Sequence, residues 1–275
     1  MNDYNNIFVH WKKSQKDFEK NLSLLLLRIN TEPVHDIRVA IKKLRAFLSL
    51  YILLKKEPEW TCLLSKTIKL FDVLGRHRDI ETCLAITVAF EKETTCSCKE
   101  WKNYLQSLLK TTRAWANQEI HHYHKKELAK TALLLKQDSS LADNISFPKD
   151  LSVIINNQLA ETRKHFRQPH LVRKNLKEVY YWISLFPDEN IIASWYYKEL
   201  HSILDDLGNW QDNEILDIRI KHFRKDYLPK PFEEYQQLKD FQNKIRDTKK
   251  ILLKSANSKA RRWMKKVLQN EKSEA

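Results

Sequence analysis

Two segments of this chain repeat one histidine, one arginine and one lysine at helical spacing. The cationic residues are His35, Arg38, Lys42 and Arg45 in the first segment and His170, Arg173 and Lys177 in the second. At 100° per residue, the four side chains of the first segment fall within about 80° of one another around a helix. Each segment therefore predicts a helix that carries a column of cations, with forked guanidinium groups and ammonium groups suited to phosphate oxygens.

An apolar stripe accompanies each column and indicates the face that is buried. The stripe residues are Ile37, Ile41, Leu44, Leu48 and Tyr51 in the first segment and Val172, Leu176, Val179, Ile183 and Phe186 in the second. Like charges three and four positions apart destabilise a helix by a few tenths of a kcal/mol each, roughly, so a cation column needs a compensating anion. A solvated basic face is the alternative interpretation of one such helix. Its recurrence with the same spacing favours an anion site.

The recurrence extends beyond the two columns and predicts an internal duplication. The two columns are 135 residues apart in the sequence. The segment Leu74–Asp79 resembles Leu207–Asp212, which lies 133 residues later. The two glycines of the chain, Gly75 and Gly208, therefore occupy equivalent places. We expect each glycine to end a helix in the left-handed conformation, with Asp79 or Asp212 capping or pairing at the start of the next helix. A catalytic aspartate is a minor alternative.

The amino-acid composition indicates both the fold class and the charge of the expected partner. The 275 residues include 49 Lys and Arg against 35 Asp and Glu, a formal net charge of +14, so an anionic partner is expected. Two glycines in such a length predict an all-α protein, and they leave no Gly-rich phosphate loop. No signal pattern, apolar run of membrane-spanning length or paired cysteine motif is present, which predicts a cytoplasmic protein without a membrane partner.

Apolar spacing and prolines predict ten helices. Their ranges are 5–28, 34–55, 59–74, 79–92 and 99–126 before a polar stretch at 137–148, and 149–167, 170–186, 191–207, 212–226 and 232–268 after it.

At the two columns the sequence resembles the CHAD family, the conserved histidine α-helical domain. The motifs that carry the resemblance are VHDIRVAIKKLRAFL, LGRHRDIE, PHLVRKNLKEVYYWI and LGNWQDNEIL, so it covers nearly the whole chain. The resemblance implies one CHAD domain made of two similar four-helix bundles with a pseudo-two-fold relation, at residues 1–140 and 141–275. It also implies basic residues around a central cleft or pore that binds inorganic polyphosphate. The implied ligands are His35, Arg38, Lys42, Lys43, Arg45, His170, Arg173, Lys174 and Lys177.

Other basic residues are assigned to the same anion site with less support. They are Arg76 and Arg78 beside the first glycine, and Arg113 and the pair Arg261 and Arg262 on the two long helices. The basic run 244–266 is interpreted equally well as a flank of the anion surface or as the solvated back of a helix. His77 is expected at the same junction, whereas Lys12 and Lys13 are expected to lie away from the site. Glu178 and Tyr180 stand where basic residues would be expected, which weakens the second column.

Neither a metal site nor a cofactor is predicted. His121, His122 and His124 lack an acidic or cysteine partner at ligand spacing, and Trp101, Trp115 and Trp182 are interpreted as core residues. No Glu-x-Glu-x-Lys string of a triphosphatase is present, so we expect no enzyme. The leading hypothesis is a polyphosphate-binding protein located at polyphosphate granules. A nucleic-acid-binding protein and a helical scaffold for an acidic protein are the alternatives.

Overall fold

The computed structural model is all-helical in the parts of the chain that it describes, which are residues 3–55, 62–94, 96–123, 126–137, 147–185 and 194–274. The helices are α1 (Asp3–Leu27), α2 (Thr31–Lys55), α3 (Ser65–Glu93), α4 (Lys99–His122), α5 (Lys126–Gln137), α7 (Phe147–Lys164), α8 (Pro169–Ser184), α9 (Ser194–Asp226) and α10 (Glu233–Glu274). The predicted all-α class is confirmed. Helix α5 was not predicted.

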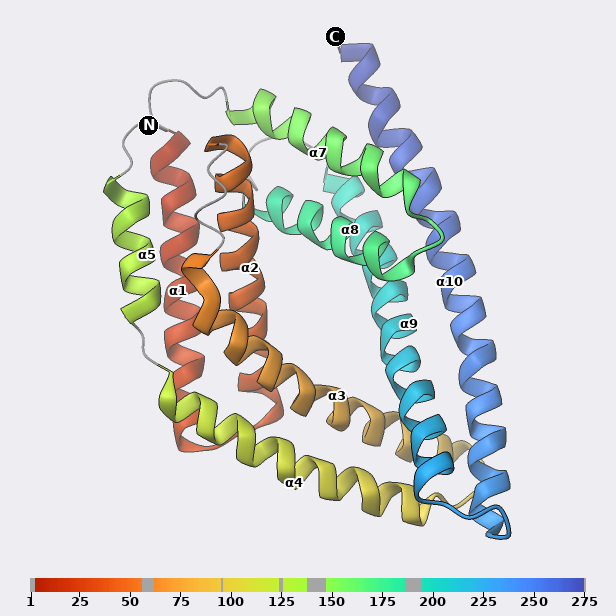
Figure 1. Cartoon of the computed structure of the whole chain (residues 1–275). Coiled ribbons are helices and arrows are strands. Elements are labelled where there is room, and N and C mark those ends of the chain that lie inside the picture. Colours follow the sequence, from red (N-terminus) through yellow and green to blue (C-terminus); the bar gives the residue numbers. More distant parts are fainter. Residues whose placement is uncertain are drawn as a thin grey trace.

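The packing order of the helices repeats along the chain. Helix α2 packs against α1 and α3, and α3 packs against α4; in the same order α8 packs against α7 and α9, and α9 packs against α10. Helix α2 also packs against α8, and α3 against α9, so helices at equivalent places in the predicted duplication meet each other (Figure 1). The predicted boundary between residues 140 and 141 lies outside the described residues.

Two hydrophobic cores hold this arrangement together, and each draws residues from both halves of the chain. The larger core includes Trp11, Leu44 and Trp182, from α1, α2 and α8. The smaller core lies where α3 and α4 meet α9 and α10, and includes Trp101 and Phe223. Because apolar burial is the main stabilising term in folding, the two halves are stabilised jointly.

The two glycines do not end helices, and this sequence-based prediction was wrong. Gly75 lies inside the continuous helix α3, and Gly208 lies inside α9. Each of these long helices replaces two shorter predicted ones. Leu70, Leu74 and Ile80 are buried on either side of the first glycine, so apolar packing continues through it and stabilises the helix there.

Candidate polyanion site

The two cation columns are brought together by the packing of α2 against α8. Ile37 and Leu44 of α2 and Val172 and Leu176 of α8 are fully buried, as their stripes predicted. The indole Nε1 of Trp182 on α8 donates hydrogen bonds across this contact to the backbone oxygen of Ala46, at 3.1 Å, and to Ser49 Oγ, also at 3.1 Å. With the stripes buried, the column residues of both helices, except His170, line the space beside the contact.

Two cavities adjoin the columns. The first, of about 880 Å³, lies between α1, α2, α8 and α9 and is lined by His10, Lys13, Ser14, His35, Val39, Lys42, Lys43, Lys177, Tyr180, Tyr181, Ser184, Leu185, Tyr197, His201, Leu204, Asp205, Gly208, Asn209 and Asp212. The second, of about 340 Å³, is lined by Arg38, Lys42, Arg45, Ala46, Ser49, Phe71, Arg173, Lys174, Lys177, Glu178 and Tyr181. Lys42, Lys177 and Tyr181 belong to both linings and lie where the cavities meet.

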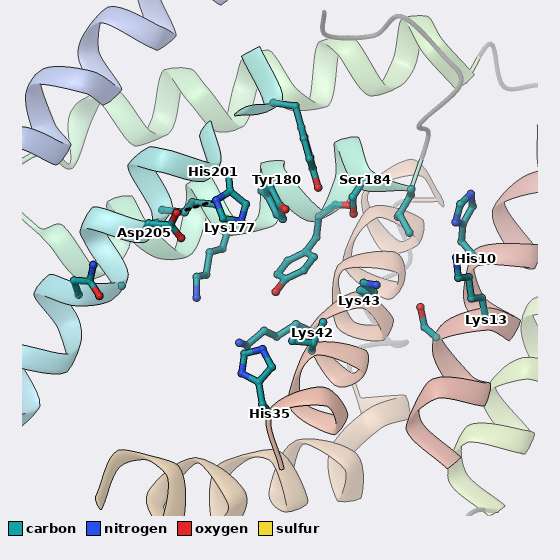
Figure 2. A pocket seen from close by; sticks show the side chains of 18 of the residues that line it. His10, Lys13, His35, Lys42, Lys43, Lys177, Tyr180, Ser184, His201 and Asp205 are labelled. Atoms are coloured by element: carbon teal, nitrogen blue, oxygen red, sulfur yellow. Dashed lines mark hydrogen bonds and ion pairs between the residues drawn. The ribbon is translucent and has the colours of Figure 1, made fainter. Parts of the chain in front are cut away.

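Lys42 and Lys177 are the central pair of cations. In Figure 2 the two side chains extend from α2 and α8 into the same space. Burial, and then the neighbouring Arg38, lowers the pKa of Lys42 to about 8. Burial, and then Arg173 and Lys42, lowers the pKa of Lys177 to about 7, with Asp212 opposing the shift. Both ammonium groups are therefore poorly solvated and repelled by other cations, a situation that a bound polyanion relieves.

Arg38 and Arg173 hold equivalent places in the two columns but have different contacts. Arg38 Nη1 donates a hydrogen bond of 2.6 Å to the backbone oxygen of Phe71 on α3, and its guanidinium lies 4.1 Å from the centre of the Phe71 ring. The same guanidinium rests against Gly75. The Nε atom of Arg173 is buried, and within the described residues it has no hydrogen-bond partner. Of the two, Arg38 is thus the arginine whose guanidinium is held by α3.

Two aspartates sit beside the cations, in the middle of α3 and α9. Burial raises the pKa of Asp79, while Arg38 opposes the shift, and burial raises the pKa of Asp212, while Arg173 opposes it. The sequence predicted helix-start roles for both residues, but each lies well inside a helix. These two carboxyl groups lie beside the guanidinium groups and partly neutralise the positive charge of the cluster before any ligand binds.

The other predicted ligands are distributed over the two cavities. His35 and Lys43 line the first cavity, whereas Arg45 and Lys174 line the second. His170 lies apart from both linings, and its Nδ1 pairs at 2.7 Å with Gln211 Oε1 on α9. The second column therefore contributes Arg173, Lys174 and Lys177, and its histidine is held by a neighbouring helix.

Glu178 is half-buried in the lining of the second cavity and accepts a hydrogen bond of 3.2 Å from Gln158 Nε2. Burial raises the pKa of this carboxyl group, while Lys174 and Arg45 oppose the shift. An acid at this place reduces the positive charge of the second cavity.

The less supported residues lie mostly elsewhere. Burial and then Lys42 lower the pKa of His35, Asp36 opposes the shift, and Arg78 adds a smaller lowering, so Arg78 lies near this histidine. Arg78 also lies 3.7 Å from Glu81. Arg76 and Arg113 are exposed and line neither cavity. Arg261 lies over the ring of Phe166 at 4.0 Å, and Arg262 lines a separate small cavity between α9 and α10. His77, expected at the site, is buried and pairs with Thr112 Oγ1 at 3.0 Å.

The lining includes residues to which the sequence assigned no binding role. Tyr180 and Tyr197 stack with ring centres 4.6 Å apart, and Tyr180 meets His201 edge-on at 5.7 Å. Lys13 and His10 reach the first cavity from α1 (Figure 2). Lys13 was expected to be distant, so that prediction was wrong. The only sequence signal for these rings is the aromatic cluster within YYWI and WYY, which resembles ordinary core sequence.

The basic run 244–266 of α10 is largely paired with acids. Lys249 forms ion pairs with Glu214 and with Asp217, the latter at 2.8 Å. Lys244 pairs with Glu93 at 2.8 Å, and the run also holds ion pairs through Arg246, Lys250, Lys259 and Lys266. This helix therefore adds little free charge to the cavities.

Two further expectations concern histidines and tryptophans. His121 and His122 pair through Nδ1 with backbone oxygens one turn earlier, at 2.8 and 2.7 Å, and His124 is not among the described residues. In the part of the chain that the structure describes, no group of three or more His, Cys, Asp or Glu residues is arranged to hold a metal ion. Trp101 and Trp182 are buried as predicted, but Trp115 is 49% exposed, so its prediction was wrong.

Within the described ranges, no helix has both the length and the apolar character needed to cross a membrane. The sequence matches the CHAD domain family over residues 12–221. The structure is similar to the crystal structure of the CHAD domain from the plant Ricinus communis, with a TM-score of 0.74 and 16% sequence identity, over 94% of this chain and 91% of the plant chain. No curated protein matches the sequence.

Proposed function

The chain belongs to the CHAD family, and from this premise we propose that it binds inorganic polyphosphate at the two cavities. The observation that carries the proposal is the central pair Lys42 and Lys177, two poorly solvated lysines between cavities lined by further cations. Polyphosphate is an unbranched chain of charges without bases, so a single strand of it can pass between half-buried lysines. Charge-assisted contacts to its oxygens then replace the lost hydration of the ammonium groups.

The alternative partner is nucleic acid, which carries the same phosphate charge. A double helix is too wide to bring its phosphates to half-buried lysines, and the aromatic rings of the first cavity do not alternate with the cations as a stacking platform for single strands would require. These observations favour polyphosphate. A scaffold for an acidic protein has no specific support, because the cations that recur in the two columns line cavities.

Competition binding tests the proposal. The assay measures how well unlabelled polyphosphate, duplex DNA, RNA or pyrophosphate displaces labelled long-chain polyphosphate from the protein. All competitors are compared at physiological salt, because the affinity of a protein for any polyanion depends strongly on the salt concentration. We expect long polyphosphate to compete most effectively. If either nucleic acid displaces the label at lower phosphate concentration than polyphosphate does, the proposal is wrong.

We propose further that the protein binds polyphosphate without cleaving it, and that this binding locates it at polyphosphate granules in the cytoplasm. Incubation with polyphosphate should release no orthophosphate above the background of a Lys42→Ala, Lys177→Ala variant. A fluorescent fusion should gather at granules, and the same double variant should spread through the cell. A diffuse wild-type fusion in cells that hold granules would contradict the location.

A further inference from the structure

The first cavity has an aromatic end as well as a cationic one. Tyr180, Tyr181 and Tyr197 from α8 and α9 line it together with His201. The rings contact one another, with Tyr180 at the centre: it stacks on Tyr197 at 4.6 Å and meets Tyr181 edge-on at 5.6 Å. All three tyrosines are half-buried, so they form part of the cavity wall and are not sealed inside a core.

This aromatic end distinguishes the first cavity from the second. At the offset of 135 residues, Tyr180 and Tyr181 correspond to Arg45 and Ala46, which line the second cavity. At these two equivalent places the second cavity has an arginine and an alanine and the first has phenol rings, of which Tyr181 also belongs to the second lining. A ligand made only of phosphates gains forked ionic contacts from an arginine, whereas a tyrosine offers it a single hydroxyl group and leaves the face of the ring unused. The aromatic end of the first cavity therefore suits a different chemical group.

An acid at the aromatic end strengthens the distinction. Asp205 lines the first cavity, and its carboxylate pairs with His201 Nδ1 at 2.9 Å. A carboxylate repels phosphate oxygens but accepts hydrogen bonds from the amino group of a base. Asn209, in the same lining, can both donate and accept. These groups fit a neutral, amino-bearing aromatic ring and not a further phosphate.

We propose that the first cavity binds a nucleoside polyphosphate, with its base among the tyrosines and its phosphates at Lys42 and Lys177. This inference rests on the proposed function, because the same lysines hold the phosphates. It adds a second ligand class, a polyphosphate chain that ends in an aromatic base. The cavity volume of about 880 Å³ lies within the range of small-molecule sites.

The test compares adenosine triphosphate with inorganic tripolyphosphate, which has the same number of phosphates. Binding of each is measured by calorimetry at one salt concentration, without divalent metal. We expect adenosine triphosphate to bind roughly ten-fold more tightly, the gain that base stacking on an aromatic side chain provides. Tyr197 lines the first cavity and not the second, so it tests the aromatic end alone. Tyr197→Leu should abolish this difference and leave tripolyphosphate affinity within about two-fold of wild type, whereas Tyr197→Phe should preserve it.

Tyr227→Leu is the matched control, because Tyr227 is 62% exposed and packs with Phe223 of the smaller core. If Tyr197→Leu fails to fold, Asp205→Asn replaces it. Loss of the carboxylate charge should tighten tripolyphosphate binding and narrow the preference for adenosine triphosphate. Equal or weaker binding of adenosine triphosphate by the wild type overturns the inference and leaves the proposed function standing. Failure of long polyphosphate to bind overturns the proposed function instead.

Discussion

The guanidinium group of Arg38 lies where a side chain on Gly75 would be. An ideal Cβ atom at Gly75 would have the Arg38 Cζ atom 3.2 Å away, closer than ordinary van der Waals contact, and Nη1 closer still. At Gly208, the equivalent residue, no heavy atom lies within 4 Å of such a Cβ. The glycine in α3 therefore has a packing role that the glycine in α9 lacks.

This difference predicts opposite effects of two matched substitutions. Gly208→Ala should raise the free energy of unfolding by about 0.5–1 kcal/mol, because alanine is the better residue inside a helix. Gly75→Ala gains the same term but displaces Arg38 from the Phe71 oxygen, a charged hydrogen bond of roughly 1.5–3 kcal/mol. We expect it to be about 1.5–3 kcal/mol less stable than Gly208→Ala in urea unfolding, because the helix term is common to both variants. Equal stability of the two variants would contradict the role assigned to Gly75.

Glycine also marks the limit of what the sequence could predict about the fold. Periodicity identified most helices, because their apolar stripes are local patterns that burial confirms, as at Ile37 and Leu44. It divided α3 and α9 at Gly75 and Gly208, because local chemistry assigns a glycine to a helix end. The reason for Gly75 is a side chain from another helix, and such contacts have no local signal.

The central lysines predict a site and not a diffuse charged surface. Lys42→Ala with Lys177→Ala should weaken polyphosphate binding by at least a hundred-fold, since each charge-assisted contact is worth roughly 1.5–3 kcal/mol. Lys110→Ala with Lys239→Ala is the matched control, because both side chains are exposed on α4 and α10 and line neither cavity. Fluorescence titration measures both. Similar losses in the two double variants would indicate that the site does not exist.

The lowered lysine pKa values predict a pH-dependent affinity. With pKa values of about 7 for Lys177 and about 8 for Lys42, the free protein loses both charges as the pH rises from 6 to 9. Polyphosphate favours the charged forms, so its affinity should fall across this range, and binding at pH 8 should take up protons. Calorimetry at pH 8 in two buffers of different ionisation enthalpy measures the uptake. An affinity that is constant from pH 6 to 9 would contradict this prediction.

The same groups predict how the stability of the free protein changes with pH. Above pH 7 the unfolded chain, with lysine pKa values near 10.5, binds more protons than the folded chain does. Stability therefore rises with pH between about 7 and 10, because deprotonation removes the cost of burying the ammonium charges and then the repulsion within the folded cluster. Saturating polyphosphate should flatten or reverse this slope. Thermal unfolding of wild type and of Lys177→Met, whose slope should be smaller, measures the effect.

The candidate site shows a similar limit of sequence reasoning. Helical spacing assigned Lys42 and Lys177 to columns beside the apolar stripes of α2 and α8, and both residues line the two cavities. Lys13, Tyr197 and Asp205 were missed, because they reach the cavity from α1 and α9. Which face of those two helices meets the cavity depends on packing across the whole molecule.

The two column arginines should contribute unequally, in an order that the sequence did not suggest. Glu178 and Tyr180 predict a weaker second column, but Arg38 of the first column is held by the Phe71 oxygen, whereas the Nε atom of Arg173 is unpaired within the described residues. For about eight phosphate contacts, the log–log dependence of affinity on salt should have a slope near −6, taking roughly 0.7 per contact. Arg173→Gln should reduce this slope by about 0.7, and Arg38→Gln should change it less while lowering the thermal stability more. Titrations at four salt concentrations provide the slopes. A larger loss of slope in Arg38→Gln than in Arg173→Gln would show that the first column holds the polyanion and that the contact with Phe71 gives way when it binds.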